Sequence, residues 1–188
     1  ACPALGRAVP ATDFSPADMA DAVRREALVR SLMLWEGRFH QPGIAYNAAS
    51  GLTYDGSDLE AETLRPTAPR TFSAASKESI QVAILASALT GNANALAFLS
   101  PEDPGRASAL ALEILSRKAG SYERFDRERP GFGGYLPWFS IADEGLKPMR
   151  GWEKKAPSLD NGQLAWSLMA LVEALRKVRE SLGPGGAA

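Results

Sequence analysis

The sequence predicts an all-α fold in which long, ordered loops join the helices. Four segments combine helix start signals with apolar residues at helical spacing, and no stretch alternates apolar and polar residues over a useful length. The two longest connections, 39–72 and 130–159, are rich in aromatic residues, which a disordered coil rarely carries. A chain of 188 residues fits one domain.

The first helix is expected over residues 15–37. Ser15 is a good capping residue, Pro16 suits the first helical position and Asp18 places an acid in the first turn. The second helix is expected to start near Ser76 and run toward Asn92. It is apolar on more than one side, which predicts burial on both faces.

The third helix is introduced by Asp103 and Pro104 and should end in the charged sequence "SYERFDRERP". The fourth follows Asp160 and should stop at Gly183-Pro184. Asp160 and Gln163 have the spacing of a helix cap and its capping-box partner, so we expect Asp160 to cap this helix.

Composition excludes several classes of function. The net charge of −1 is unlike that of a protein that binds a nucleic-acid backbone, and no apolar run approaches the roughly 20 residues that cross a membrane. Cys2 is the only cysteine and His40 the only histidine, which excludes an internal disulfide, a Cys/His zinc site and a Ser-His-Asp triad within this chain. Any hydrolysis must therefore use carboxylates.

Residues 1–14 are expected to form an irregular N-terminal segment. They are small, include prolines and show no helical pattern. Such a segment is compatible with what remains after a signal peptide is removed. On this ground we expect a secreted or extracytoplasmic protein.

The loop "PGFGGYLPWFSIADEG" carries the residue types of a carbohydrate site. Aromatic side chains stack on the apolar faces of sugars, and carboxylates bind their hydroxyl groups. The glycines allow a sharp turn that can place Tyr135 and Trp138 on one surface. The alternative is that these aromatic residues simply close the end of a helical core.

Other polar candidates have ordinary structural explanations. Glu78 lies in the first turn of the second helix, where the helix dipole favours a negative charge. Asp55 and Asp58 lie near glycine but lack the closing glutamate of a calcium loop, so they are expected in a turn. His40 is expected at the surface or at a helix end, and no metal site is predicted.

Four motifs in order, "GLTYDG", "SAASKES", "GFGGYLPWF" and "PSLDNGQLAW", resemble those of the glucoamylase-like carbohydrate enzymes that include the endo-β-1,2-glucanases. The pairing of "GGYLPWF" with "LDNGQLAW" is the most specific part. The resemblance implies an α/α toroid, in which two rings of helices carry a sugar cleft at one end. It also implies an inverting hydrolase that uses two carboxyl groups and no metal or organic cofactor.

The resemblance assigns residues by motif. Asp160 matches a carboxylate of the family's substrate cleft, while Tyr135, Trp138 and Gln163 belong to the matched motifs. Glu78 is a looser match, and Trp152 is expected to hold sugar beside Tyr135 and Trp138. The family's acid and base are expected in later helices than this chain contains, so neither can be named.

Chain length shapes the functional hypotheses. Twelve helices with short connections need on the order of 240 residues, and four helices are recognised here. We therefore expect the N-terminal portion of an (α/α)6 toroid, completed by the remainder of the same polypeptide or by a partner subunit, and acting on β-1,2-glucan. The alternatives are a non-catalytic glycan-binding subunit and a purely structural helical subunit.

Overall fold

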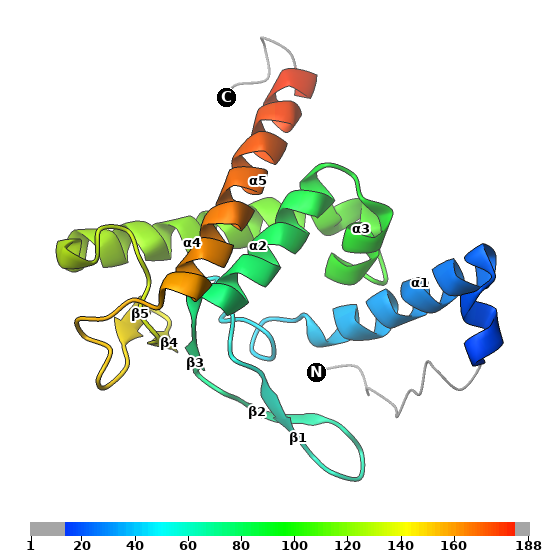
Figure 1. Ribbon diagram of the computed structural model, residues 1–188, viewed down its shortest axis with the longest axis horizontal. Coiled ribbons are helices and arrows are strands. Elements are labelled where there is room, and N and C mark those ends of the chain that lie inside the picture. Colours follow the sequence, from blue (N-terminus) through cyan, green and yellow to red (C-terminus); the bar gives the residue numbers. More distant parts are fainter. Residues whose placement is uncertain (1–13, 183–188) are drawn as a thin grey trace.

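The computed structural model describes residues 14–182, so the segment 1–13 and the expected stop at Gly183-Pro184 lie outside the described residues. The chain is mostly helical with two small antiparallel sheets, which corrects the expectation of a purely helical fold. Helices α2, α4 and α5 form the centre of the molecule (Figure 1). Helix α1 and the β1–β2 hairpin extend away from this centre.

The predicted first helix is two helices. A 3₁₀ helix, η1 (Pro16–Met19), follows Ser15, which caps it as expected, and Asp18 completes a capping box with Ser15. Helix α1 (Ala22–Phe39) then begins after Asp21, whose side chain accepts a hydrogen bond from the Arg24 amide at 2.9 Å. The second cap at Asp21 starts a new helix where one continuous helix was predicted.

Helix α2 (Ala75–Leu89) is shorter than predicted because Gly91 adopts φ +80° just after it. Asn92 caps a separate helix, α3 (Ala93–Leu99), which the sequence interpretation missed. Most of α2 is buried, as expected, with Val82 and Leu85 fully enclosed. Ile80 is exposed, so the predicted burial on both faces holds only in part.

Helix α4 (Ala107–Glu128) follows a short 3₁₀ helix, η2 (Pro104–Arg106). It continues through the charged sequence expected to end it, because Ser121 and Phe125 keep its buried face intact. A 3₁₀ turn, η3 (Pro130–Phe132), leads into the second long loop, and α5 (Ser158–Leu182) ends the described chain. Helices α2 and α5 pack side by side and run in the same direction (Figure 1).

Both long connections contain short strands that the sequence pattern did not reveal. Strands β1 (Ser57–Leu59) and β2 (Pro66–Pro69) form a hairpin. Strands β3 (Phe72–Ser73), β4 (Phe139–Ala142) and β5 (Gly145–Pro148) form a three-stranded antiparallel sheet in that order. This sheet joins the two long loops to each other. Strands of two to four residues are too short to produce a readable alternation.

The apolar core has two parts. One part lies among α2, α3, α4 and α5 and includes Leu89, Leu99 and Ile114. The other includes Leu52, Val82, Phe125, Leu136, Phe139 and Leu164, and packs the three-stranded sheet against the central helices. Full burial of each such side chain contributes about 1.5–3 kcal/mol. The second part fixes the loops beside the first turns of α2 and α5.

Within residues 14–182, no single helix is long and apolar enough to cross a membrane. Helices α2 and α3 reach such a length and composition only as a pair, and they are bent by 117° to each other.

Candidate functional site

Asp160 lies at the open end of α5. The helix begins at Ser158, so Asp160 is inside the first turn, and its predicted role as a helix cap paired with Gln163 is wrong. Its carboxylate instead accepts a hydrogen bond from the Trp138 indole, with 3.1 Å between Oδ2 and Nε1. Asp160 is partly buried and keeps a second carboxylate oxygen for another donor.

Trp138 stacks on Trp152. The ring centroids are 4.7 Å apart and the planes are inclined by 18°. Trp138 comes just before β4 and Trp152 just after β5, so the β4–β5 hairpin brings them together. Trp138 is 41% exposed. We call Trp138, Trp152 and Asp160 the rim platform.

Tyr135 and Gln163 are the two other predicted binding residues near these segments. Tyr135 is 60% exposed and precedes Trp138 by three residues. Gln163 is exposed on α5, one helical turn after Asp160. Within residues 14–182, neither side chain makes a hydrogen bond, so both are free to meet a ligand.

A cavity of about 410 Å³ lies between η3 and the segment after Trp152. Its lining includes Phe132 and three cationic side chains, Arg129, Lys154 and Lys155. This volume lies within the range of small-molecule sites. The second long loop therefore provides an aromatic surface, and residues close to it in sequence line a cavity.

The loop before Trp138 has the sharp turn that its glycines predict. Gly133 and Gly134 adopt φ values of +57° and +83°, in the left-handed region that favours glycine. Leu136 and Phe139 are then buried and anchor the loop. Asn161, which the sequence interpretation missed, hydrogen-bonds to both backbone groups of Leu136. In the sequence, Asn161 could have been recognised as a polar residue on the buried side of α5, one turn before Leu164.

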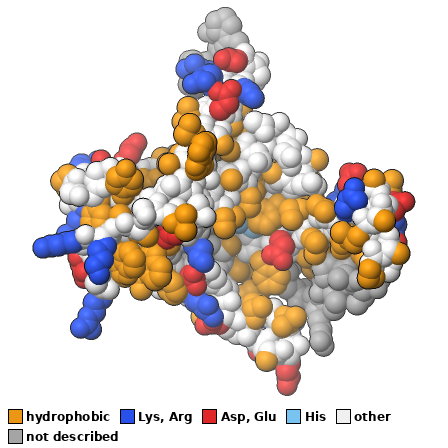
Figure 2. All heavy atoms as spheres, viewed as in Figure 1, with side chains coloured by type: hydrophobic (Ala, Val, Ile, Leu, Met, Phe, Trp, Pro, Cys, Tyr) orange, Lys and Arg blue, Asp and Glu red, His pale blue; other side chains and the backbone are white. Residues whose placement is uncertain are grey.

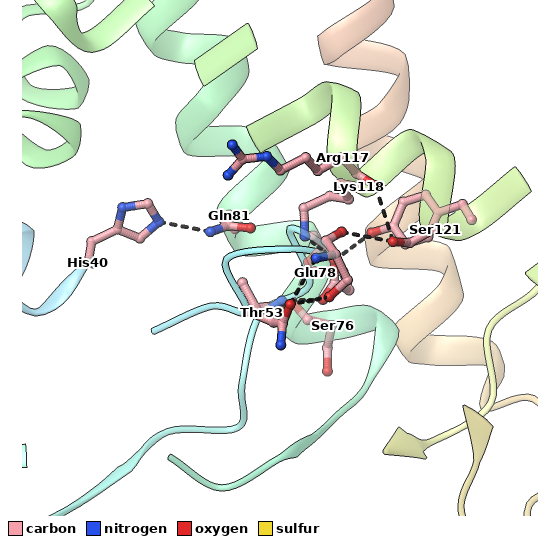
Figure 3. Close-up of polar contacts among 12 residues, drawn as sticks. His40, Thr53, Ser76, Glu78, Gln81, Arg117, Lys118 and Ser121 are labelled. Carbon is pink, nitrogen blue, oxygen red and sulfur yellow. Dashed lines mark hydrogen bonds and ion pairs between the residues drawn. The ribbon is translucent and has the colours of Figure 1, made fainter. Parts of the chain in front are cut away.

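Glu78 has a different environment. Its side chain is 0% exposed and accepts hydrogen bonds from the Thr53 amide at 2.8 Å and the Thr53 hydroxyl at 2.5 Å. It also accepts from the Tyr122 hydroxyl at 2.5 Å and forms an ion pair with Lys118 (Figure 3). We call these four residues the buried hub. The sugar contact suggested for Glu78 stays a prediction, since its carboxylate has no exposed surface here.

Burial shifts the pKa values of two residues of the buried hub, Lys118 and Tyr122. Burial lowers the pKa of the Lys118 ammonium, and the neighbouring Glu78 carboxylate opposes that shift. Burial, reinforced by Glu78, raises the pKa of Tyr122 well above its usual value, so the phenol remains a neutral donor. Lys118 was missed by the sequence interpretation. In the sequence it could have been recognised as a charged residue on the mostly apolar face of α4.

Gly51 allows the first long loop to reach the hub. It adopts φ +72°, and a Cβ atom there would lie 2.8 Å from the Ile114 carbonyl oxygen and 2.9 Å from the Lys118 amide nitrogen. Any side chain would push the loop away from α4. The glycine therefore lets Thr53 reach Glu78, and the hub ties this loop to α2 and α4.

His40 extends the polar interior toward α1. It is the C-terminal cap residue of α1, as one of the two expectations had it, but it is buried between Tyr46 and Phe98, with ring centroids 5.1 Å away in both cases. Its Nε2 lies 2.8 Å from Gln81 Nε2 (Figure 3). Burial lowers the pKa of His40 to about 4, so the ring is neutral at pH 7.

Asp55 and Asp58 of the first loop are balanced by cations. Arg70 pairs with Asp58 at 2.8 Å and with Asp55 at 3.7 Å, and Lys77 pairs with Asp55 at 3.1 Å. In the described part of the chain, no three His, Cys, Asp or Glu residues are grouped so that they could hold a metal ion.

Comparisons with known proteins agree with this arrangement. The family model for the endo-β-1,2-glucanase SGL matches residues 52–183, which include the hub and the rim platform. No curated protein gives a significant match. Two solved structures match with a TM-score of 0.85 and 37% identity. They are the Talaromyces funiculosus endo-β-1,2-glucanase with sophorose and a mutant of that enzyme with β-1,2-glucan.

The match covers 91% of this chain but 34% of the glucanase, so the chain spans about a third of the length of these structures. The family model extends over most of the sequence, from the first long loop to the end of the last helix. The chain therefore belongs to the endo-β-1,2-glucanase SGL family, GH162.

Proposed function

We propose that this chain supplies part of the sugar-binding cleft of an inverting hydrolase that acts on β-1,2-glucan. Trp138 offers an exposed aromatic face, Trp152 supports it from behind, and Asp160 accepts hydrogen bonds beside it. Tyr135 and Gln163 extend the same surface with side chains that are free to bind. The juxtaposition of the Trp138–Trp152 stack with the Asp160 carboxylate is the observation that carries this proposal.

The proposed architecture is an arc of an α/α toroid. Its support is the pair α2 and α5, which lie side by side, run in the same direction and open at the same end as the long loops (Figure 1). The proposal places the acid and base of the reaction outside this chain, which spans about a third of the matched glucanase. No metal or organic cofactor takes part in the proposed chemistry.

The proposal includes a physical partner for α5. This helix exposes Trp166, which is 74% exposed, together with Leu159, Met169, Val172 and Leu175. Hydrophobic side chains can be followed along α5 where it rises above the body (Figure 2). A helix with apolar residues on nearly all sides is normally buried. The remainder of the same polypeptide, or a partner subunit, covers this surface.

Asp160→Asn tests the sugar site with little structural change. Asparagine can still accept the Trp138 hydrogen bond, so the substitution mainly removes charge. Because hydrogen bonds to charged groups contribute about 1.5–3 kcal/mol against about 1 kcal/mol for neutral ones, we expect sophorose affinity measured by calorimetry to fall by about 2- to 30-fold. Activity of the complete protein on β-1,2-glucan should fall similarly. Unchanged affinity and activity would remove Asp160 from the site.

Two other functions make different predictions for the same samples. A non-catalytic glycan-binding subunit would bind β-1,2-glucan saturably, and its complete assembly would release no new reducing ends. A structural helical subunit would bind no glucan and form a stable hetero-oligomer through α5. The exposed apolar face of α5 is the observation that supports this last function.

A further inference from the structure

Asn161 makes the most complete set of side-chain hydrogen bonds near the rim platform. Its Oδ1 accepts from the Leu136 amide at 2.8 Å. Its Nδ2 donates to the Leu136 carbonyl oxygen at 2.9 Å and to the Pro157 carbonyl oxygen at 2.8 Å. The side chain is 7% exposed, so both amide hydrogens and the amide oxygen are used inside the protein.

The two residues joined by these hydrogen bonds lie close in sequence to two members of the rim platform, Asp160 and Trp138. Asn161 directly follows Asp160 in α5, and Leu136 precedes Trp138 by two residues. The hydrogen bonds with Leu136 therefore fix the spacing between the helix start and the loop. That spacing determines whether the Trp138 indole can reach the Asp160 carboxylate at 3.1 Å.

The contact also defines the direction in which Trp138 points. Leu136 and Phe139 are buried in the core on either side of it, while Trp138 is exposed. A loop released from Asn161 can rotate about its apolar anchors, because van der Waals packing is less directional than paired hydrogen bonds. Leaving the buried Leu136 amide and carbonyl unpaired is also costly, so the hydrogen-bonded position of the loop is favoured over other positions.

We propose that Asn161 is a positioning residue of the sugar site: it holds the Leu136 peptide so that Trp138 stacks on Trp152 and meets Asp160. Asn161 does not face the ligand and acts only through the platform. The part of this inference that concerns sugar rests on the proposed function, whereas the part that concerns the tryptophan stack does not.

Asn161→Asp in the full chain tests the inference. A carboxylate can accept from the Leu136 amide, but it cannot donate to the two carbonyl oxygens and is repelled by them. Stacked indoles give an exciton couplet in far-ultraviolet circular dichroism, which reports on the Trp138–Trp152 geometry, and Trp152→Phe identifies its signal. We expect the couplet to lose at least half its amplitude and sophorose affinity to fall at least tenfold in N161D.

Ile114→Val is the matched control. Ile114 is fully buried on α4 in the other part of the core, so its truncation lowers stability without touching the loop. The couplet should be unchanged in I114V, and sophorose affinity should stay within twofold. If N161D unfolds, Asn161→Ser, which retains one donor and one acceptor, replaces it in the same measurements.

The outcomes separate the two proposals. A lower melting temperature in N161D with the couplet and the affinity intact would overturn the positioning role. If the unmodified chain binds no sophorose, the proposed function loses its support and the couplet alone decides on Asn161. In that case loss of the couplet supports the positioning role, and its persistence overturns it.

Discussion

Helices α2 and α5 lie side by side, run in the same direction and each place a carboxylate in the first turn. Glu78 of α2 is fully enclosed and fully hydrogen-bonded, whereas Asp160 of α5 is reached from solvent and meets one indole. The same position in a helix therefore serves two purposes. The difference comes from the neighbours. Helix α4 and the first long loop cover α2, but α5 is covered on one side only.

The contrast extends along both helices. Most side chains of α2 are buried, and the exposed Ile80 is an exception. Helix α5 buries Leu164 and Ala174 on one side and exposes Trp166 and Met169 on another. Burial thus makes α2 the structural centre, while exposure makes the start of α5 available for binding.

The largest expected effect is on the hub. Glu78→Gln leaves Lys118 buried without its counter-charge, which should cost about 3–5 kcal/mol of unfolding free energy in urea. Asp160→Asn, the equivalent change on α5, removes a favourable charge from the start of the helix but keeps an acceptor for Trp138, and should cost about 0.3–1 kcal/mol. Adding Lys118→Met to Glu78→Gln should recover part of the loss, because the buried positive charge is removed while glutamine still offers Thr53 and Tyr122 an acceptor. Equal costs for the two single variants would break the contrast between α2 and α5.

The next effect concerns pH. The pKa of His40, which contacts Gln81 of α2, is lowered from 6.5 to about 4 by burial. As pH falls, the unfolded chain binds this proton first, so the stability contribution is complete above pH 6.5 and is lost progressively toward pH 4. The shift corresponds to about 3 kcal/mol. In His40→Gln the fall in unfolding free energy over this range should be shallower. Parallel curves would contradict the assignment.

A smaller effect is expected on the open side. Trp152→Ala removes the ring behind Trp138, and aromatic pairs contribute about 0.5–1.5 kcal/mol beyond their buried area. Sophorose affinity measured by calorimetry should therefore fall by about fivefold. Trp35→Ala on α1 removes an indole that packs against Arg38, away from the platform, and should leave the affinity unchanged. An equal loss in both variants would mean that the stack has no special role.

The smallest effect is expected on the exposed face of α5. Trp166→Ser should change the unfolding free energy of the chain by less than about 0.5 kcal/mol, as for most surface positions. Leu85→Ala on α2 should cost about 2–5 kcal/mol in the same urea titration. Binding of an apolar dye should fall in the Trp166 variant alone. A large loss of stability in that variant would show that α5 is not open on this side.

The sequence was sufficient to predict where most helices lie, but not where a predicted helix is broken into two. The cap at Ser15, the acid at Asp18 and the apolar spacing of the last helix are local properties, so they could be recognised. The break at Asp21 and the separate α3 were missed, because a second cap inside a helical pattern is weaker evidence than the pattern itself. The three-stranded sheet could not be predicted, since it pairs residues from two loops almost 70 positions apart.

The candidate site was predicted in its residues and not in its contacts. Trp138, Trp152 and Asp160 were all expected to bind sugar, and the structure places them together. The predicted capping role of Asp160 was wrong, because α5 already begins at Ser158. Lys118 and Asn161 were missed because their partners lie 40 and 25 positions away, and only the three-dimensional arrangement reveals such pairs.

The position of Asn161 along the chain also sets the order in which the molecule can be completed during synthesis. The hub needs nothing beyond Tyr122, so the first long loop, α2 and α4 can join while the rest is still being made. The loop that holds Trp138 is synthesised before Asn161, so its hydrogen bonds to Asn161 can form only later. Every residue of the buried hub is therefore synthesised before the residue that fixes the loop of Trp138.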